Sequence, residues 1–319
     1  MNGRNWQRAA ATIAAPILAS IATAVAQNPS PNLSGIAHVA IRVSNLDASR
    51  AFFHKLGFEE AFAMNKQGKP TEALFKINDR QFIELYPRNT PAEWAGFMHI
   101  CFEAADIEAL HQDYVAHGLT PKPIVRAGAG NLLFTLQGPD EPGAPSDPRL
   151  AATQNIEYTQ YMPGSRHTLD GGRHLGPDRV AEQMAGVGIR MQDLEAAASF
   201  YEDKLSFRLA THPLERGVTA LTLPGTPDEQ IELLSPAAEP SGQPAELPAI
   251  PHSANAGMEL HFRILFSIPD LRTTRARLRS LGFAPKKHGA TLTIHDPDGD
   301  AIVFVAARTD SAAVRAAGH

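Results

Sequence analysis

Two histidines and two glutamates occupy matching places in two related segments of the chain. His38 lies near the start of GIAHVAIRVSNLDASRAFFHKLGF, and Glu84 lies in QFIELYP at the end of the same unit. His99 lies near the start of GFMHICFEAADIEALHQDYVAHGL, and Glu157 lies in NIEYTQYMP at the end of the second unit. Imidazole and carboxylate groups together suit a divalent first-row metal. The four residues therefore predict a metal site.

The segments that carry this quartet share one order of elements with two later segments. Each begins with a strand, followed by a polar turn, an amphipathic helix and further strands. The four related stretches are residues 41–58, 102–119, 189–207 and 266–283. Apolar residues at helical spacing predict the first helix, with Asp47 in its first turn, Lys55 in its last and Gly57 as its stop. Each unit is therefore predicted to fold as βαβββ.

Composition limits the classes of protein that fit. The chain has 319 residues, of which 43% are hydrophobic and 20% charged, as in a globular protein with a sizeable core. Its net charge of -5 carries no basic footprint for nucleic acid. A single cysteine, Cys101, excludes an internal disulfide.

The first 26 residues have the features of a secretory signal peptide. Arg4 and Arg8 precede an apolar stretch rich in small residues, which ends in an Ala-Val-Ala cleavage site. We expect an exported protein, periplasmic or secreted, that begins at Gln27 and has no stable membrane association. An uncleaved membrane anchor is the alternative, and Pro16 together with the many alanines disfavours it.

The motifs LDASRAFFHKLGF, QFIELYP and DPDGD (296–300) resemble those of the vicinal oxygen chelate superfamily, which includes glyoxalases, bleomycin-binding proteins and extradiol dioxygenases. The resemblance implies an α+β fold in which two βαβββ modules pair into a half-open β-barrel cup. Four modules imply two tandem glyoxalase-like domains, residues 33–163 and 181–308. Residues 164–180 would link them, and residues 309–319 would form a disordered tail.

The resemblance also places metal ligands on the first and last strands of each module. In the first cup these places hold His38, Glu84, His99 and Glu157, a set that accepts Zn, Ni, Co, Mn or Fe(II). In the second cup they hold Gly186, Glu232, Arg263 and Val303, with His261 two residues before Arg263. We expect one divalent metal in the first cup and a degenerate site in the second.

Other residues near the quartet have a structural and a functional interpretation. Cys101 is expected to be a small buried residue rather than a ligand or nucleophile. Arg42 would form an ion pair with Glu103 across the cup, or else bind an anionic substrate. Tyr86 and Tyr161 follow the two glutamates on the same faces and are candidates for contacts with the substrate. His167 and His174 in the linker are expected to be solvated loop residues.

The family resemblance predicts Lewis-acid chemistry on a small molecule with two adjacent oxygens. Glu84 and Glu157 would flank the metal, and either could move a proton, as in a glyoxalase-like or epimerase-like lyase or isomerase. An extradiol Fe(II) dioxygenase using His38, His99 and Glu157 is the alternative. Members of that group carry a His and a Tyr shortly before the glutamate, and RAGAGNLLFTLQGPD (126–140) has neither. A module that only binds and sequesters a small molecule is the third hypothesis. The oligomeric state stays open.

Overall fold

The structure is a computed structural model that describes residues 32–91, 93–138, 155–191, 193–214, 217–235 and 262–307. The predicted signal peptide (1–26), the predicted tail (309–319) and His261 lie outside the described residues. Within the described part of the chain, no helix combines the length and apolar character needed to cross a membrane.

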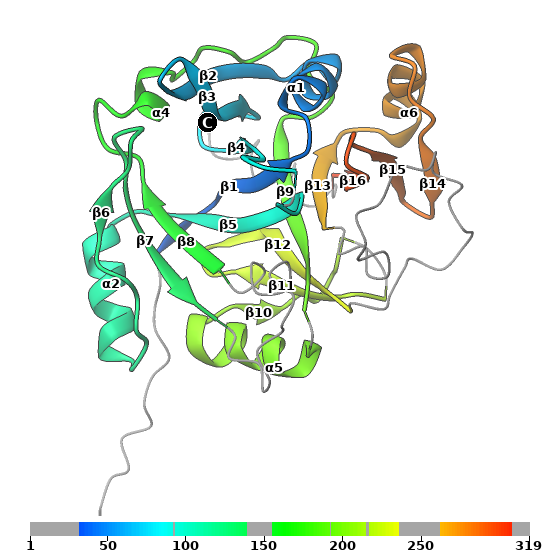
Figure 1. Cartoon of the computed structure of the whole chain (residues 1–319). Helices are drawn as coiled ribbons and strands as arrows, with labels where there is room; N and C mark the ends of the chain where they lie inside the picture. Colours follow the sequence, from blue (N-terminus) through cyan, green and yellow to red (C-terminus); the bar gives the residue numbers. More distant parts are fainter. Residues whose placement is uncertain are drawn as a thin grey trace, which may run out of the picture.

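The first half of the described chain forms one curved sheet with the strand order β2-β3-β4-β1-β5-β8-β7-β6 (Figure 1). Two modules meet at its centre, where β1 and β5 pair antiparallel. Within each module the first and last strands pair parallel, β1 with β4 and β5 with β8. The elements are β1 (Leu33–Val43), α1 (Leu46–Lys55), β2 (Glu59–Lys66), β3 (Lys69–Lys76), β4 (Phe82–Pro87), β5 (Gly96–Ala104), α2 (Ile107–Ala116), β6 (Val125–Arg126), β7 (Leu132–Gln137) and β8 (Asn155–Gln160).

The second half forms a sheet of the same topology, with the order β10-β11-β12-β9-β13-β16-β15-β14. A short helix, α4 (Arg166–Leu169), lies between the two sheets in sequence. The elements of this half are β9 (Gln183–Arg190), α5 (Leu194–Ser199), η1 (Phe200–Lys204), β10 (Arg208–Leu209), β11 (Thr219–Leu223), β12 (Thr226–Leu234), β13 (Arg263–Ile268), α6 (Leu271–Ser280), β14 (Lys286–His288), β15 (Thr291–His295) and β16 (Ala301–Ala306). The predicted α+β fold of two tandem cups is confirmed.

Helix α1 shows how local sequence sets these elements. Asn45 caps it by accepting a hydrogen bond from the Ala48 backbone N–H at 3.1 Å. Beyond its end, Gly57 has φ +83°, and a Cβ there would lie 2.5 Å from the backbone oxygen of Asp178. Gly57 is therefore required both by its backbone conformation and by close packing. The predicted helix and its stop are confirmed.

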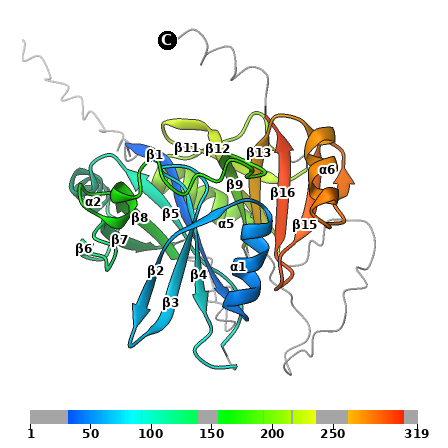
Figure 2. The same cartoon turned by 90° about the horizontal axis from the view of Figure 1, so that it is seen from above.

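Alternation along the strands separates the site from the core. His38 and Ala40 point to the concave face of the first sheet, so Val39 and Ile41 point to its outer face. The outer faces of both sheets share one hydrophobic core, and the two sheets lie against each other in both views (Figures 1 and 2). Aromatic pairs join the two halves, such as Phe102 with Phe207 at a centroid distance of 5.4 Å. The concave face of the first sheet carries the predicted ligands.

Candidate metal centre

Four adjacent strands, β4, β1, β5 and β8, carry the predicted ligands onto one face. In the register, Ala40 lies opposite both Glu84 and His99, while Cys101 lies opposite both His38 and Glu157. Side chains of paired residues point to the same face of a sheet. The structure therefore brings all four predicted ligands together on the concave side.

The distances show that His38 lies at the centre of the cluster. Its Nε2 lies 3.1 Å from Nε2 of His99 and 3.5 Å from Oε1 of Glu157. Nε2 of His99 lies 3.9 Å from Oε2 of Glu157. Glu84 lies on the other side of the His38 ring, with its Oε1 3.4 Å from Nδ1. The Nε2 atoms of the two histidines and the carboxylate of Glu157 are thus close together, whereas the carboxylate of Glu84 faces Nδ1 of His38.

Burial shifts the proton affinity of every member of the quartet. It lowers the pKa of His38 well below its usual value, with a smaller contribution from His99, and it lowers the pKa of His99 to about 4. It also raises the pKa of Glu84 well above its usual value, and that of Glu157 to about 7. The imidazoles are therefore neutral, as metal ligands must be. The carboxylates are buried acids whose charge a bound cation would stabilise.

The residues present fit a divalent metal. Nε2 of His38 and Nε2 of His99, two buried nitrogens of neutral imidazoles, face each other at 3.1 Å, with Oε1 of Glu157 3.5 Å from the first. Two groups of side chains have ligand atoms within 4.8 Å of one another, His38 with Glu84 and His99, and His38 with Cys101 and Glu157. Neutral nitrogen donors beside carboxylates suit Zn, Mn or Fe(II) in particular. This donor set does not by itself select one of these metals.

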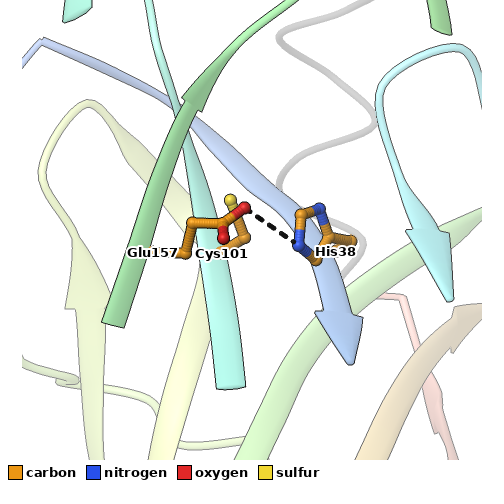
Figure 3. A group of neighbouring side chains, drawn as sticks. All are labelled: His38, Cys101 and Glu157. Atoms are coloured by element: carbon orange, nitrogen blue, oxygen red, sulfur yellow. Dashed lines mark ion pairs between the residues drawn. The ribbon is translucent and has the colours of Figure 1, made fainter. Parts of the chain in front are cut away.

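Cys101 lies within the cluster. It is fully buried, as predicted. Its position opposite both His38 and Glu157 in the register places its sulfur beside them, and Figure 3 shows the three side chains together. Burial and the charge of Glu157 raise the pKa of the thiol well above its usual value. Without a metal, Cys101 is therefore a neutral, unreactive group in the floor of the cup.

Sequence reasoning missed a third carboxylate on this face, Glu72 of β3. Leu74 lies opposite Glu84 in the register, so Glu72, two residues earlier, shares the concave face. The hydroxyl of Tyr86 donates a hydrogen bond to Glu84 at 3.0 Å. Burial raises the pKa of Glu72, and the charge of Glu72 raises that of Glu84. The alternation of β3 was the signal that could have placed Glu72.

The predicted substrate contacts have different surroundings. Tyr86 lies beside Glu84, as described above. Arg42 stacks over the ring of Trp94 at 4.5 Å and lies 3.9 Å from Glu93. The predicted ion pair between Arg42 and Glu103 is wrong, because Arg42 pairs with Gly96 at one end of β5 while Glu103 lies near its other end.

The prediction that the linker histidines are solvated loop residues is wrong for His167, which lies in α4, whereas His174 is a loop residue with a 39% exposed side chain. His167 is 4% exposed and stacks on Tyr161 at a centroid distance of 4.3 Å. His174 contacts a carboxylate oxygen of Asp170 through Nδ1 at 2.5 Å. The cause is the buried ammonium group of Lys76, which donates to the backbone and side-chain oxygens of Asp170 at 2.6 and 2.9 Å. These contacts hold the linker against the first sheet.

The second cup has a different interior. Glu232 forms an ion pair with Arg263, with Nε and Oε2 2.9 Å apart. A Cβ at Gly188 would lie 2.5 Å from Cγ of Arg263, so the glycine makes room for the arginine. A small apolar cluster that includes Leu265 and Val303 packs beside it. In this cup the carboxylate of Glu232 faces a guanidinium group and not a pair of imidazoles.

Paired βαβββ cups with histidines and glutamates on the concave face define a protein of the vicinal oxygen chelate class. The model of the Glyoxalase/Bleomycin resistance protein/Dioxygenase superfamily matches residues 35–143 and 182–304. The chain belongs to this superfamily.

Individual relatives agree with this assignment. The uncharacterized protein YwkD of Bacillus subtilis (strain 168) is 30% identical over 100 residues, which cover 29% of this chain and 78% of YwkD. The Mn(II)-bound glyoxalase from Novosphingobium aromaticivorans has a TM-score of 0.57 and 15% identity over 86% of this chain and 83% of that one. An extradiol ring-cleaving dioxygenase from B. fuscum has a TM-score of 0.57 and 14% identity over 87% of this chain and 72% of that one. At these identities the two structures show the fold alone.

Proposed function

We propose that the protein is a metal-dependent enzyme that moves a proton at a carbon next to two chelating oxygens of a small molecule, as a glyoxalase-like or epimerase-like lyase or isomerase. The observation that carries the proposal is that three ligand-type side chains from three other strands surround the buried ring of His38. A protein that only needed a polar core would have no reason to bury two carboxylates beside two neutral imidazoles, because unpaired buried carboxylates are unfavourable. The relatives named above include one Mn(II)-bound glyoxalase.

His38, His99 and Glu157 would hold the metal, since their donor atoms lie on one side of the His38 ring. When bound, a divalent metal supplies Lewis-acid stabilisation of the negative charge that develops on a substrate oxygen. The remaining work falls to side chains of the protein.

Glu84 is the residue that we assign as the base. It lies on the opposite side of the His38 ring from Glu157, and burial together with the charge of Glu72 raises its pKa well above its usual value. A carboxylate with a raised pKa has an increased affinity for a proton taken from carbon. The hydroxyl of Tyr86 donates to Oε2 of Glu84 and so orients the carboxylate.

An extradiol-type dioxygenase is the second candidate, and one observation favours it. The side of His38 that faces His99 and Glu157 presents two imidazoles and one carboxylate, which is the ligand set of non-heme Fe(II) oxygenases. In that case Glu84 would only orient the Nδ1 side of the ring. We place this candidate second because residues 126–138 supply neither a histidine nor a tyrosine.

Metal analysis tests the site. We expect about one divalent ion per chain in the protein that begins at Gln27, and loss of that ion in His38→Ala and Glu157→Ala. Glu232→Gln, which changes a buried glutamate on a strand of the second cup, is the control. The control should keep the metal. Retention of the ion in both alanine variants would refute the site.

Turnover separates the three functions. Exchange of solvent deuterium into a carbon beside a carbonyl would support the lyase or isomerase. Oxygen consumption with catechols would support the dioxygenase. Tight binding of a small molecule with neither reaction would support a sequestration module. We also propose that the protein is exported, on the basis of residues 1–26. Cell fractionation tests this proposal, since the cleaved protein should appear outside the cytoplasm.

A further inference from the structure

Helix α4 bridges the two free edges of the first sheet. Strands β2 and β6 lie at opposite ends of the strand order. The side chain of Arg166 donates to the backbone oxygen of Ala63 in β2 at 3.0 Å, and its backbone N–H donates to the oxygen of Ala129, after β6, at 2.8 Å. Figure 1 shows α4 beside β2 and β3. The linker thus closes one end of the cup.

His167 is the residue of this bridge that lies over the concave face. Its ring packs edge-on against Phe82 at a centroid distance of 5.0 Å and stacks on Tyr161 at 4.3 Å. Phe82 lies opposite His38 in the register, and Tyr161 follows Glu157 by four residues, so both belong to the face that carries the quartet. His167 is near enough to His38 to lower the pKa of that residue.

Three polar atoms at this end of the cup have no hydrogen-bond partner in the part of the chain that the structure describes. Both ring nitrogens of His167 and the hydroxyl oxygen of Tyr161 are buried and accept or donate no hydrogen bond among the described residues. His167 is 4% exposed, so bulk solvent does not reach its ring nitrogens. Buried polar groups in native proteins are nearly always paired, and an unpaired cluster needs an explanation. A bound ligand would supply the partners.

We propose that His167 and Tyr161 form the recognition end of the substrate pocket, where they hydrogen-bond a hydroxyl group that the substrate carries beyond its two chelating oxygens. This inference rests on the proposed function. A neutral imidazole offers one donor and one acceptor, and a phenol offers the same pair. Together they match a neutral hydroxyl better than a carboxylate or phosphate, which would need a cation. Burial keeps the imidazole neutral by lowering the pKa of His167 to about 4.

The test compares binding of 2-oxo acids that differ only at their far end. The Mn(II)-loaded protein is titrated by calorimetry with a ladder of 2-oxo acids of increasing length, each with a terminal methyl or a terminal hydroxyl group. We expect the wild type to bind the hydroxylated acid about tenfold more tightly at one length. His167→Phe should remove this preference and keep the binding of the methyl acid. Tyr161→Phe should reduce the preference without disturbing the ring stack.

A matched control is His111→Phe. His111 also packs edge-on to a phenylalanine, Phe134, but its Nε2 contacts the backbone oxygen of Lys122 outside the cup. The control should keep the preference for the hydroxylated acid. If His167→Phe does not fold, Tyr161→Phe decides, since it removes only one oxygen atom.

The outcomes distinguish failure of the proposed role of His167 from failure of the proposed metal-dependent function. A wild-type protein that binds the acids with no preference at any length overturns the role of His167, and so does a preference that survives in both variants. In these cases the metal-dependent function stands. A Mn(II)-loaded wild type that binds none of the acids overturns the proposed function and this inference together.

Discussion

The buried carboxylate of Glu157 makes a quantitative prediction about stability. Burial raises its pKa from 4.5 in an exposed glutamate to about 7 in the metal-free fold. Since a tenfold change in proton affinity corresponds to about 1.4 kcal/mol, the ionised carboxylate destabilises the folded state by about 3 kcal/mol. Glu157→Gln should therefore stabilise the metal-free protein.

The effect has a defined dependence on pH. The folded state binds the proton of Glu157 more tightly than the unfolded state does, so the unfavourable contribution is absent at a pH below about 4.5, grows up to about pH 7 and is complete above that. The gain from Glu157→Gln should follow the same course. Both proteins are unfolded with urea after chelator treatment, at several pH values, and the difference in free energy of unfolding is plotted.

A metal should reverse the sign of this difference. Mn(II) bound to the wild type stabilises the folded state by mass action, and the variant lacks one ligand. With saturating metal, the wild type should become the more stable protein. A difference that does not change with pH, or a variant that stays more stable when metal is present, would refute the assignment of Glu157 as a buried ligand.

Three further predictions concern charges outside the site. Burial also raises the pKa of Glu229 to about 7. Glu229→Gln should therefore raise the free energy of unfolding, measured with urea, over the same pH range as Glu157→Gln, and should leave the metal content unchanged. A loss of metal would contradict the position of Glu229 outside the site. Lys76→Met should lower the free energy of unfolding by about 3–5 kcal/mol because it removes the buried cation that Asp170 pairs with, and protease should then cut the linker faster; unchanged stability and cleavage would contradict this. Arg263→Met should destabilise the fold by a similar amount, about 3–5 kcal/mol, by breaking the ion pair with Glu232, whereas metal content stays constant; release of the metal would show that the second cup contributes to binding.

Much of the fold follows from local sequence. Period-two alternation in HVAIRV and helical spacing from Leu46 onward depend only on residues that are close in sequence. The faces of the strands and the ends of the helix could therefore be predicted. The shared face of His38, Glu84, His99 and Glu157 was predictable for a related reason, because equivalent places in related modules point to the same side of the sheet.

The surroundings of the site were less predictable, because they depend on contacts between distant segments. The burial of His167 depends on Lys76, which lies in a strand about ninety residues earlier and holds the linker through Asp170. The separation of Arg42 from Glu103 depends on the register of two antiparallel strands, which alternation alone does not fix. Glu72 was missed although its alternation with Leu74 was visible, because β3 carries no predicted ligand.

The single core behind the two sheets constrains how this chain can change. Each sheet packs an outer face of aromatic and aliphatic side chains against the other sheet. A fragment that ended in the linker would therefore expose this apolar face to water. The carboxy-terminal half thus supplies core to the first sheet although its own cup does not carry the four ligand-type residues. The two halves, if separated, should therefore aggregate or reassociate and should not be stable as separate proteins.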